Sequence, residues 1–203
     1  MKTFLSTTLL GLLAAPALAF AQDAAPAATD VMKPVLAIGP AIASWGLVFA
    51  FAGAALGTIL PCIGSILGVS MVGQAGSGLL TEKPELMGKV ITIVVLPGSQ
   101  GLYGMVISLL FFFNYGPMLT ETLLISTFDG LLLFTAFLPV MFTGLTSAPY
   151  QAKVCTAGMQ MLARDGKLAG RVITLAALVE TYALLGFLIS FFMLNLFKAA
   201  IIG

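Results

Sequence analysis

Histidine is absent from the 203-residue chain, cysteine occurs only twice, and charged residues are scarce. Charged side chains make up 8% of the sequence, whereas an average soluble domain carries about 25%. Without histidine, and with Cys62 and Cys155 far apart in apolar segments, a transition-metal site lacks its usual ligands. We expect both cysteines to be small apolar packing residues. A formal net charge of +1, without any basic run, argues against a nucleic-acid partner.

Hydrophobic residues dominate instead, at 60% of the sequence and a mean hydropathy of +1.10, which indicates a protein embedded in lipid. Four apolar segments, at residues 41–78, 88–114, 123–162 and 168–198, each exceed the roughly 20 residues needed to cross a bilayer. They lack the alternation of barrel strands, and backbone groups in lipid need partners within their own segment. The predicted fold is an all-α membrane protein with four transmembrane helices.

The first residues have the pattern of a targeting segment. Lys2 precedes an apolar run, and Ala19 and Ala21 supply the small residues of a cleavage site. We therefore predict a signal peptide at residues 1–21 and an Ala/Pro-rich linker at 22–40; a retained extra helix is the alternative. Such a signal predicts insertion into a bacterial inner membrane, with the mature N-terminus outside the cytoplasm.

Positive charges are unevenly distributed among the loops. The first loop holds Lys83 and Lys89, and the third holds Arg164, Lys167 and Arg171. The middle loop holds neither lysine nor arginine. Because these residues concentrate in cytoplasmic loops, we expect the first and third loops in the cytoplasm and both mature termini outside.

The second half of the chain repeats the first. Residues 98–112, GSQGLYGMVISLLFF, resemble residues 180–193, ETYALLGFLISFFM, at an offset of about 82 residues. The four helices are therefore predicted to be two tandemly duplicated hairpins, at residues 41–119 and 120–203.

Glu180 stands out in this repeat, because Gly98 takes its place in the first hairpin. Apolar turns flank Glu180, and an ionisable side chain near the middle of a membrane costs at least about 2.5 to 3.5 kcal/mol. It is a functional-site candidate, with a protonated structural carboxyl as the alternative. Gln100 and Gln151 lie at a similar depth when residues are counted from the cytoplasmic loops, at about 1.5 Å each. Three helices thus bring polar side chains to one layer.

The stretch LPGSQGLYG adds further oxygens to this layer. One helix face, at the spacing i, i+3, i+4, i+7, carries Leu96, Ser99, Gln100 and Tyr103. Pro97 cannot donate to the carbonyl four residues earlier, so the spacing points to a free carbonyl at Ile93. Neutral oxygens around one carboxylate suit a hard monovalent cation, and sodium fits better than calcium or magnesium. A proton, which needs only the carboxyl and an acceptor, is the alternative.

The first helix is rich in glycine, with small-xxx-small pairs at Gly53/Gly57 and Gly64/Gly68. Glycine is costly inside a helix unless another backbone must come close. The pattern indicates either the crowded inner wall of a ring of identical copies or packing within a single bundle.

Three motifs, LPGSQGLYG, TGLTSAPYQAKVCTAG and LVETYALLGFLISFF, occur in this order along the four segments. Together they resemble the proteolipid (K or c) subunit of bacterial V-type ATPases, in its duplicated, sodium-carrying form. The resemblance covers roughly residues 45–196. It implies a homomeric ring that turns against a stator, with the first and third helices on its inner wall. ATP chemistry then belongs to other subunits, and this chain is not itself an enzyme.

The resemblance also implies a ligand set for the transported sodium ion: the carboxylate of Glu180, side-chain oxygens of Gln100, Gln151 and Ser99, and the carbonyl of Leu96. Tyr103 would donate a hydrogen bond to Glu180 and hold it closed over the ion. The family pattern thus favours the Leu96 carbonyl as the backbone ligand, whereas the spacing from Pro97 points to the Ile93 carbonyl. Ser99 stands where the sodium-type pattern usually has threonine, and it keeps the ligating hydroxyl.

The resemblance implies four kinds of partner: identical copies in the ring, a stator subunit whose arginine faces Glu180, central-stalk subunits at the cytoplasmic loops, and membrane lipid. No permanently bound cofactor is expected, and Na⁺ or H⁺ is the cargo. The alternatives to a sodium-carrying rotor are the same rotor carrying protons, and a stand-alone channel or secondary transporter. Secondary transporters tend to use inverted repeats, whereas these two hairpins run parallel.

Overall fold

The computed structural model describes residues 45–121 and 125–201; the predicted signal peptide and linker, residues 1–40, lie outside them. The described residues are helical and include no strand. The elements are α2 (Trp45–Glu82), η1 (Pro84–Leu86), α3 (Met87–Val95), η2 (Leu96–Gly98), α4 (Ser99–Glu121), α5 (Thr127–Arg164), η3 (Gly166–Leu168) and α6 (Ala169–Ile201). The prediction of an all-α fold is confirmed.

Four stretches of the described chain are long and apolar enough to cross a membrane. They are Trp45–Glu82, Pro84–Pro117, Thr127–Arg164 and Gly166–Ile201, with mean hydropathies from 1.7 to 2.1. Each end lies within about four residues of the end predicted from hydropathy. The predicted number of spans is therefore confirmed by length and composition.

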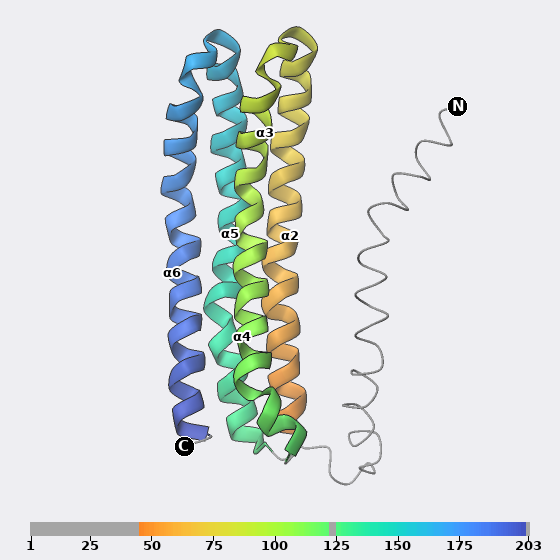
Figure 1. Ribbon diagram of the computed structural model, residues 1–203, viewed down its shortest axis with the longest axis vertical. Coiled ribbons are helices and arrows are strands. Elements are labelled where there is room, and N and C mark those ends of the chain that lie inside the picture. The colour runs from red at the N-terminus through yellow and green to blue at the C-terminus, as the bar shows by residue number, and fades with distance from the viewer. Residues whose placement is uncertain (1–44, 122–124, 202–203) are drawn as a thin grey trace, which may run out of the picture. The chain divides into compact units, whose positions relative to one another are not determined.

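These helices form a bundle of two hairpins. α2 pairs with the rod made of α3 and α4, α5 pairs with α6, and α2 packs along α5 to join the hairpins (Figure 1). The two tight turns, at Lys83 and Asp165, lie at the same end of the bundle (Figure 1). There the Lys83 ammonium donates to the Ala163 carbonyl at 2.5 Å. The first and third loops therefore face the same side of any membrane that the bundle crosses.

Local side-chain chemistry determines where the second hairpin begins and turns. Ser126 accepts a hydrogen bond from the backbone N–H of Asp129 at 3.0 Å and so caps the N-terminus of α5. Asp165 accepts from the backbone N–H of Lys167 at 2.9 Å, at the start of η3. In the first hairpin, Lys83 takes the corresponding place, and Pro84 follows it as the first residue of η1, where its missing N–H is not needed.

Glycines let α2 lie close to α5. A Cβ at Gly64 would lie 2.7 Å from the Gly144 carbonyl oxygen, and one at Gly57 would lie 2.6 Å from the Phe137 ring. Side chains at these positions would push the two helices apart. The structure therefore shows that the glycines serve packing within the chain; that α2 also lines the inner wall of a ring of identical copies stays a prediction.

The segment Leu96–Gly98 divides the second rod into α3 and α4. Pro97 has no N–H to continue the α-helical hydrogen bonds, and the segment forms the 3₁₀ turn η2. The backbone N–H of Ser99 closes this turn by donating to the Leu96 carbonyl. Pro97 also packs on α2, since a Cβ at Gly68 would come within 2.7 Å of its ring. The turn thus fixes the start of α4 against α2.

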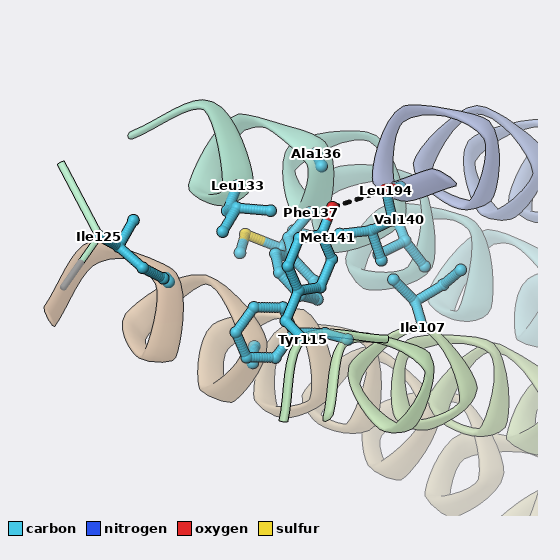
Figure 2. Close-up of a cluster of buried hydrophobic side chains, with 12 residues drawn as sticks. Ile107, Tyr115, Ile125, Leu133, Ala136, Phe137, Val140, Met141 and Leu194 are labelled. Atoms are coloured by element: carbon cyan, nitrogen blue, oxygen red, sulfur yellow. Dashed lines mark hydrogen bonds between the residues drawn. The ribbon is translucent and has the colours of Figure 1, made fainter. Parts of the chain in front are cut away.

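Two apolar clusters fill the interior. The first, toward the two tight turns, includes Val90, Ile93, Leu162 and Val172. Figure 2 shows the second, toward the opposite end, where the Tyr115 hydroxyl donates to the Leu194 carbonyl at 2.7 Å. Along their helices, the fully buried Gln100 and Gln151 fall between the residues of the two clusters. A polar layer therefore separates two apolar ones.

Gly104 offers a direct test of the packing of α4 on α2. A Cβ there would collide with the Gly57 carbonyl oxygen and come within 2.8 Å of the Pro61 ring. We expect Gly104→Ala to lower the free energy of unfolding in detergent by about 1–3 kcal/mol, as overpacking does, and so to lower the thermal midpoint. Gly88→Ala is the control, because no atom lies within 4 Å of a Cβ there. Equal midpoints for the two variants would contradict the close approach.

Candidate functional site

Glu180 lies on α6 and is held from two neighbouring helices. The Tyr103 hydroxyl of α4 donates to its Oε1 at 2.5 Å, and Nε2 of Gln151 on α5 donates to its Oε2 at 3.5 Å. The side chain is only partly buried, so the carboxylate reaches the flank of the bundle. Both carboxylate oxygens thus have a partner inside the protein, which a charge at this depth requires.

Gln100 and Gln151 form the buried part of the site. Nε2 of Gln100 donates to Oε1 of Gln151 at 2.7 Å, and Nε2 of Gln151 donates to the Ala176 carbonyl at 3.2 Å. A buried amide without partners would destabilise the fold. The paired amides therefore connect α4, α5 and α6 at the level of Glu180.

Ser99 extends this network to the backbone of η2. Its hydroxyl donates to the Leu96 carbonyl at 3.1 Å and lies 3.4 Å from Oε1 of Gln100. The Leu96 carbonyl, which the family pattern favours, is therefore part of the network. The side chain of Ile93 is fully buried in an apolar cluster; that its carbonyl is free, to which the spacing from Pro97 points, stays a prediction.

The structure brings the six residues that the resemblance assigns to the site into one hydrogen-bonded network. In order of their bonds, they are Leu96, Ser99, Gln100, Gln151, Glu180 and Tyr103. Among these six, Glu180 alone carries a formal charge. These hydrogen bonds, to the backbone carbonyl of Leu96 and between the side chains of the other five, place the residues at one depth. That they bind an ion stays a prediction.

Two other charged residues within the spans have partners elsewhere. Asp129 accepts from the Ser126 hydroxyl at 2.7 Å near the start of α5. The Lys153 ammonium lies 4.4 Å from the centre of the Tyr150 ring, a favourable contact between a cation and an aromatic face. In the part of the chain that the structure describes, no three of His, Cys, Asp and Glu are placed to hold a metal ion. A cation at Glu180 would therefore meet one carboxylate and neutral oxygens.

Ser65 belongs to this region although the sequence does not single it out. Its hydroxyl accepts from the backbone N–H of Gly101 at 2.9 Å and so anchors the first turn of α4 on α2. The only sequence signal is a serine in a glycine-rich helix, which does not identify a partner. The Ala176 carbonyl is equally invisible in the sequence, because its bond to Gln151 depends on how the helices pack.

Fold and site together define a class: a small membrane proteolipid in which two helical hairpins surround one carboxylate within the membrane span. The model of the family described as the C subunit of ATP synthase matches the chain twice, at residues 52–111 and 134–193. Two matches that start at residues 52 and 134 confirm the predicted duplication and its offset. The chain belongs to this family of ATP synthase C subunits.

Known proteins are similar over most of the chain. The V-type sodium ATPase subunit K of Enterococcus hirae is 47% identical over 146 residues, which cover 72% of this chain and 90% of that protein. The c' subunit of the V-type proton ATPase of Candida glabrata is 31% identical over 70% of this chain and 84% of that protein. The A-type ATP synthase subunit K of Methanocaldococcus jannaschii is 30% identical over 73% of this chain and 62% of that protein.

Membership of the family has two direct consequences. The chain is a duplicated four-helix proteolipid of the V-type ATPase kind and a multi-pass membrane protein. Proteolipid subunits are not catalysts, because ATP hydrolysis takes place on other subunits of the complex. The prediction of a non-enzymatic subunit is confirmed by this membership.

Tyr103→Phe tests the hold on Glu180, because it removes only the hydroxyl that bonds Oε1. A hydrogen bond to a charged group contributes about 1.5–3 kcal/mol. We therefore expect a carboxyl-reactive carbodiimide to label Glu180 about tenfold faster in this variant, measured by mass spectrometry of the labelled peptide. Tyr182→Phe, two residues beyond Glu180 on α6, is the control. Unchanged labelling of Tyr103→Phe would show that the hydroxyl does not restrain the carboxylate.

Proposed function

We propose that this chain is a rotor subunit of a V-type rotary ATPase and carries Na⁺ on Glu180 across the membrane sector. The observation on which the proposal rests is the network of oxygen-bearing groups around one carboxylate within the membrane span. The similarity to the V-type sodium ATPase subunit K of Enterococcus hirae supports the choice of ion.

The chemistry of the network suits a small monovalent cation. Carboxylate, amide, hydroxyl and carbonyl oxygens are the ligands that hard cations prefer. One carboxylate neutralises one positive charge, so a site loaded with Na⁺ has no net charge and can pass lipid at low cost. A divalent cation would leave an excess positive charge in the membrane.

Loading requires the network to exchange hydrogen bonds for ion contacts. The bond from Gln151 to Oε2 of Glu180, at 3.5 Å, is long and easily given up. The Ser99 hydroxyl donates to the Leu96 carbonyl, so its proton must turn away before both oxygens can bind Na⁺. The two amide oxygens keep lone pairs that the present bonds do not use. Tyr103 needs no change, since it holds Oε1 and leaves Oε2 for the ion.

Rotation requires that copies of the chain form a ring. Each copy has two hairpins and one intramembrane carboxylate, because Gly98 stands in the place of Glu180. Each copy then moves one ion per revolution. At the stator, an arginine of another subunit attracts the Glu180 carboxylate away from Tyr103, and the ion is released. In a bacterial inner membrane, the turns at Lys83 and Asp165 face the cytoplasm and contact the central stalk.

Proton transport by the same rotor is the second candidate, and the similarity to the c' subunit of the V-type proton ATPase of Candida glabrata favours it. The two candidates differ in what the neutral oxygens do. Sodium needs them as ligands, whereas a proton is carried by the carboxyl alone. A stand-alone channel or transporter differs from both in assembly, because it would purify without a ring of identical copies.

Carbodiimide labelling distinguishes sodium from protons. The reagent modifies a protonated carboxyl, so Na⁺ bound at Glu180 blocks it. In the purified oligomer we expect labelling to fall as NaCl replaces KCl at constant pH and ionic strength. Ser99→Ala removes one proposed ligand and should raise the half-protecting Na⁺ concentration by about tenfold, the equivalent of about 1.4 kcal/mol.

Ser77→Ala, which alters an exposed serine of α2, is the matched control and should behave as the native chain. Labelling that proceeds but does not respond to NaCl would reject sodium and favour the proton. Equal sodium protection in Ser99→Ala and Ser77→Ala would remove Ser99 from the ligand set.

A further inference from the structure

The two hairpins repeat each other, but one helix face is covered only in the first. Residues at the same distance from the starts of the two family matches occupy equivalent places in the hairpins. In the first hairpin, Ile93, Gln100 and Ile107 are fully buried. The second hairpin covers them: Gln100 bonds Gln151, and the other two join apolar clusters with residues of α5 and α6.

The equivalent face of α6 has no such cover. Its residues Leu175, Tyr182 and Ile189, here called the α6 stripe, are 49%, 66% and 53% exposed. A different face is exposed in both hairpins, as the equivalent pair Leu102 and Leu184 shows. A helix face that is exposed in both hairpins is suited to contact with lipid. The α6 stripe is exposed in one hairpin only, so it is a face that lacks its neighbour.

α2 carries the opposite uncovered face. Met141 and Ala148 of α5 are 2% and 0% exposed, beneath the first hairpin. Their equivalents on α2, Ile59 and Ile66, are 48% and 67% exposed. The first hairpin of a second copy, packed on the α6 stripe, would cover both faces at once. Such a head-to-tail contact uses different surfaces on the two copies and can close into a ring.

A groove of about 430 Å³ hollows each of these two faces. The groove on α2 is lined by Ser65, Ile66, Val69 and Ser70. The groove on the second hairpin is lined by Thr143, Thr146, Ser147, Tyr150, Val179 and Tyr182. Both hollows are shallow and mainly apolar, so each leaves room for apolar side chains of a neighbouring copy.

The polar layer indicates which residues meet between copies. Within the chain, Gln100 of the first hairpin bonds Gln151 of the second. The same contact between copies pairs Tyr182, the counterpart of Gln100 in the second hairpin, with Val69, the counterpart of Gln151 in the first. In place of the two amides, this contact would have the Tyr182 ring packed against the small apolar side chain of Val69.

The second hydrogen-bonded pair of the site, Tyr103 and Glu180, also has counterparts that cannot form the hydrogen bond. Within the chain, Tyr103 donates to Glu180. Their equivalents are Leu185 of one copy and Gly98 of the next. Leu185 has no hydroxyl to donate, and Gly98 has no carboxylate to receive one. Where the Glu180 site has two amides, a hydroxyl and a carboxylate, the counterparts are therefore the Tyr182 ring, two apolar side chains and a glycine, although each pair would draw its residues from two separate copies.

We propose that the interface between copies contains an ion-free counterpart of the Glu180 site, filled by the Tyr182 ring of one copy packed against Val69 and Gly98 of the next. The proposal rests on the ring of the proposed function and adds which surfaces meet in it. A Cβ at Gly98 would lie 3.6 Å from Cγ2 of Val69, so Val69 borders the space that a carboxylate would fill. Tyr182 takes up that space and keeps water and ions out.

Paired cysteines test the contact. In a chain with Cys62→Ala and Cys155→Ala, Val69→Cys and Tyr182→Cys are combined and treated in membranes with a short bifunctional thiol reagent. Every copy then has one cysteine on each face, so we expect a ladder of covalent dimers and larger oligomers on a denaturing gel. Val69→Cys with Leu184→Cys, on the lipid-facing side of α6, is the control and should give monomers.

Gly98→Cys with Leu185→Cys provides a second, independent pair if Tyr182→Cys weakens the oligomer. Failure of both pairs to cross-link in an oligomer that survives detergent would overturn this interface and leave the ring standing. Cross-links that stop at dimers, stay within one chain or appear equally in the control pair would also overturn it. A chain that forms no oligomer at all would instead reject the proposed function.

Discussion

A carboxylate in the middle of a membrane needs partners that lipid cannot supply, and the rest of this bundle depends on that constraint. Glu180 of α6 obtains them from Tyr103 on α4 and Gln151 on α5. The turn at Pro97 fixes the start of α4 on α2. Glycines of α2 in turn let α2 lie against α5. The apolar clusters above and below then keep the three helices together around the polar layer.

Duplication explains why this layer contains only one carboxylate. Each hairpin carries the same helical framework, as its own match to the family model shows. A second carboxylate at Gly98 would need its own set of neutral partners, and the equivalent positions hold Val69 and Leu185 instead. The polar groups needed by one charge are therefore present once, at the contact between the two hairpins of one chain. In the interface that we propose, the contact between copies is left for apolar packing.

Much of the fold can be predicted from the sequence because its signals are local. Hydropathy predicts the spans, the repeat predicts the hairpins, and the constant rise of a helix predicts that Glu180, Gln100 and Gln151 share one depth. Contacts between helices are harder to predict. Glycine spacing shows that a neighbour lies close to α2 but does not identify it as α5. Likewise, the bond from Gly101 to Ser65 depends on how α4 packs on α2.

The number of sodium ions bound per chain tests most directly the central claim that Glu180 forms one ion site in each copy. Equilibrium binding of radioactive sodium to the purified oligomer, with the protein quantified by amino-acid analysis, measures this ratio. We expect one Na⁺ per chain in the native protein and none in Glu180→Gln, which keeps the shape of the side chain without its charge. No bound sodium in the native protein, or two ions per chain, would contradict the account.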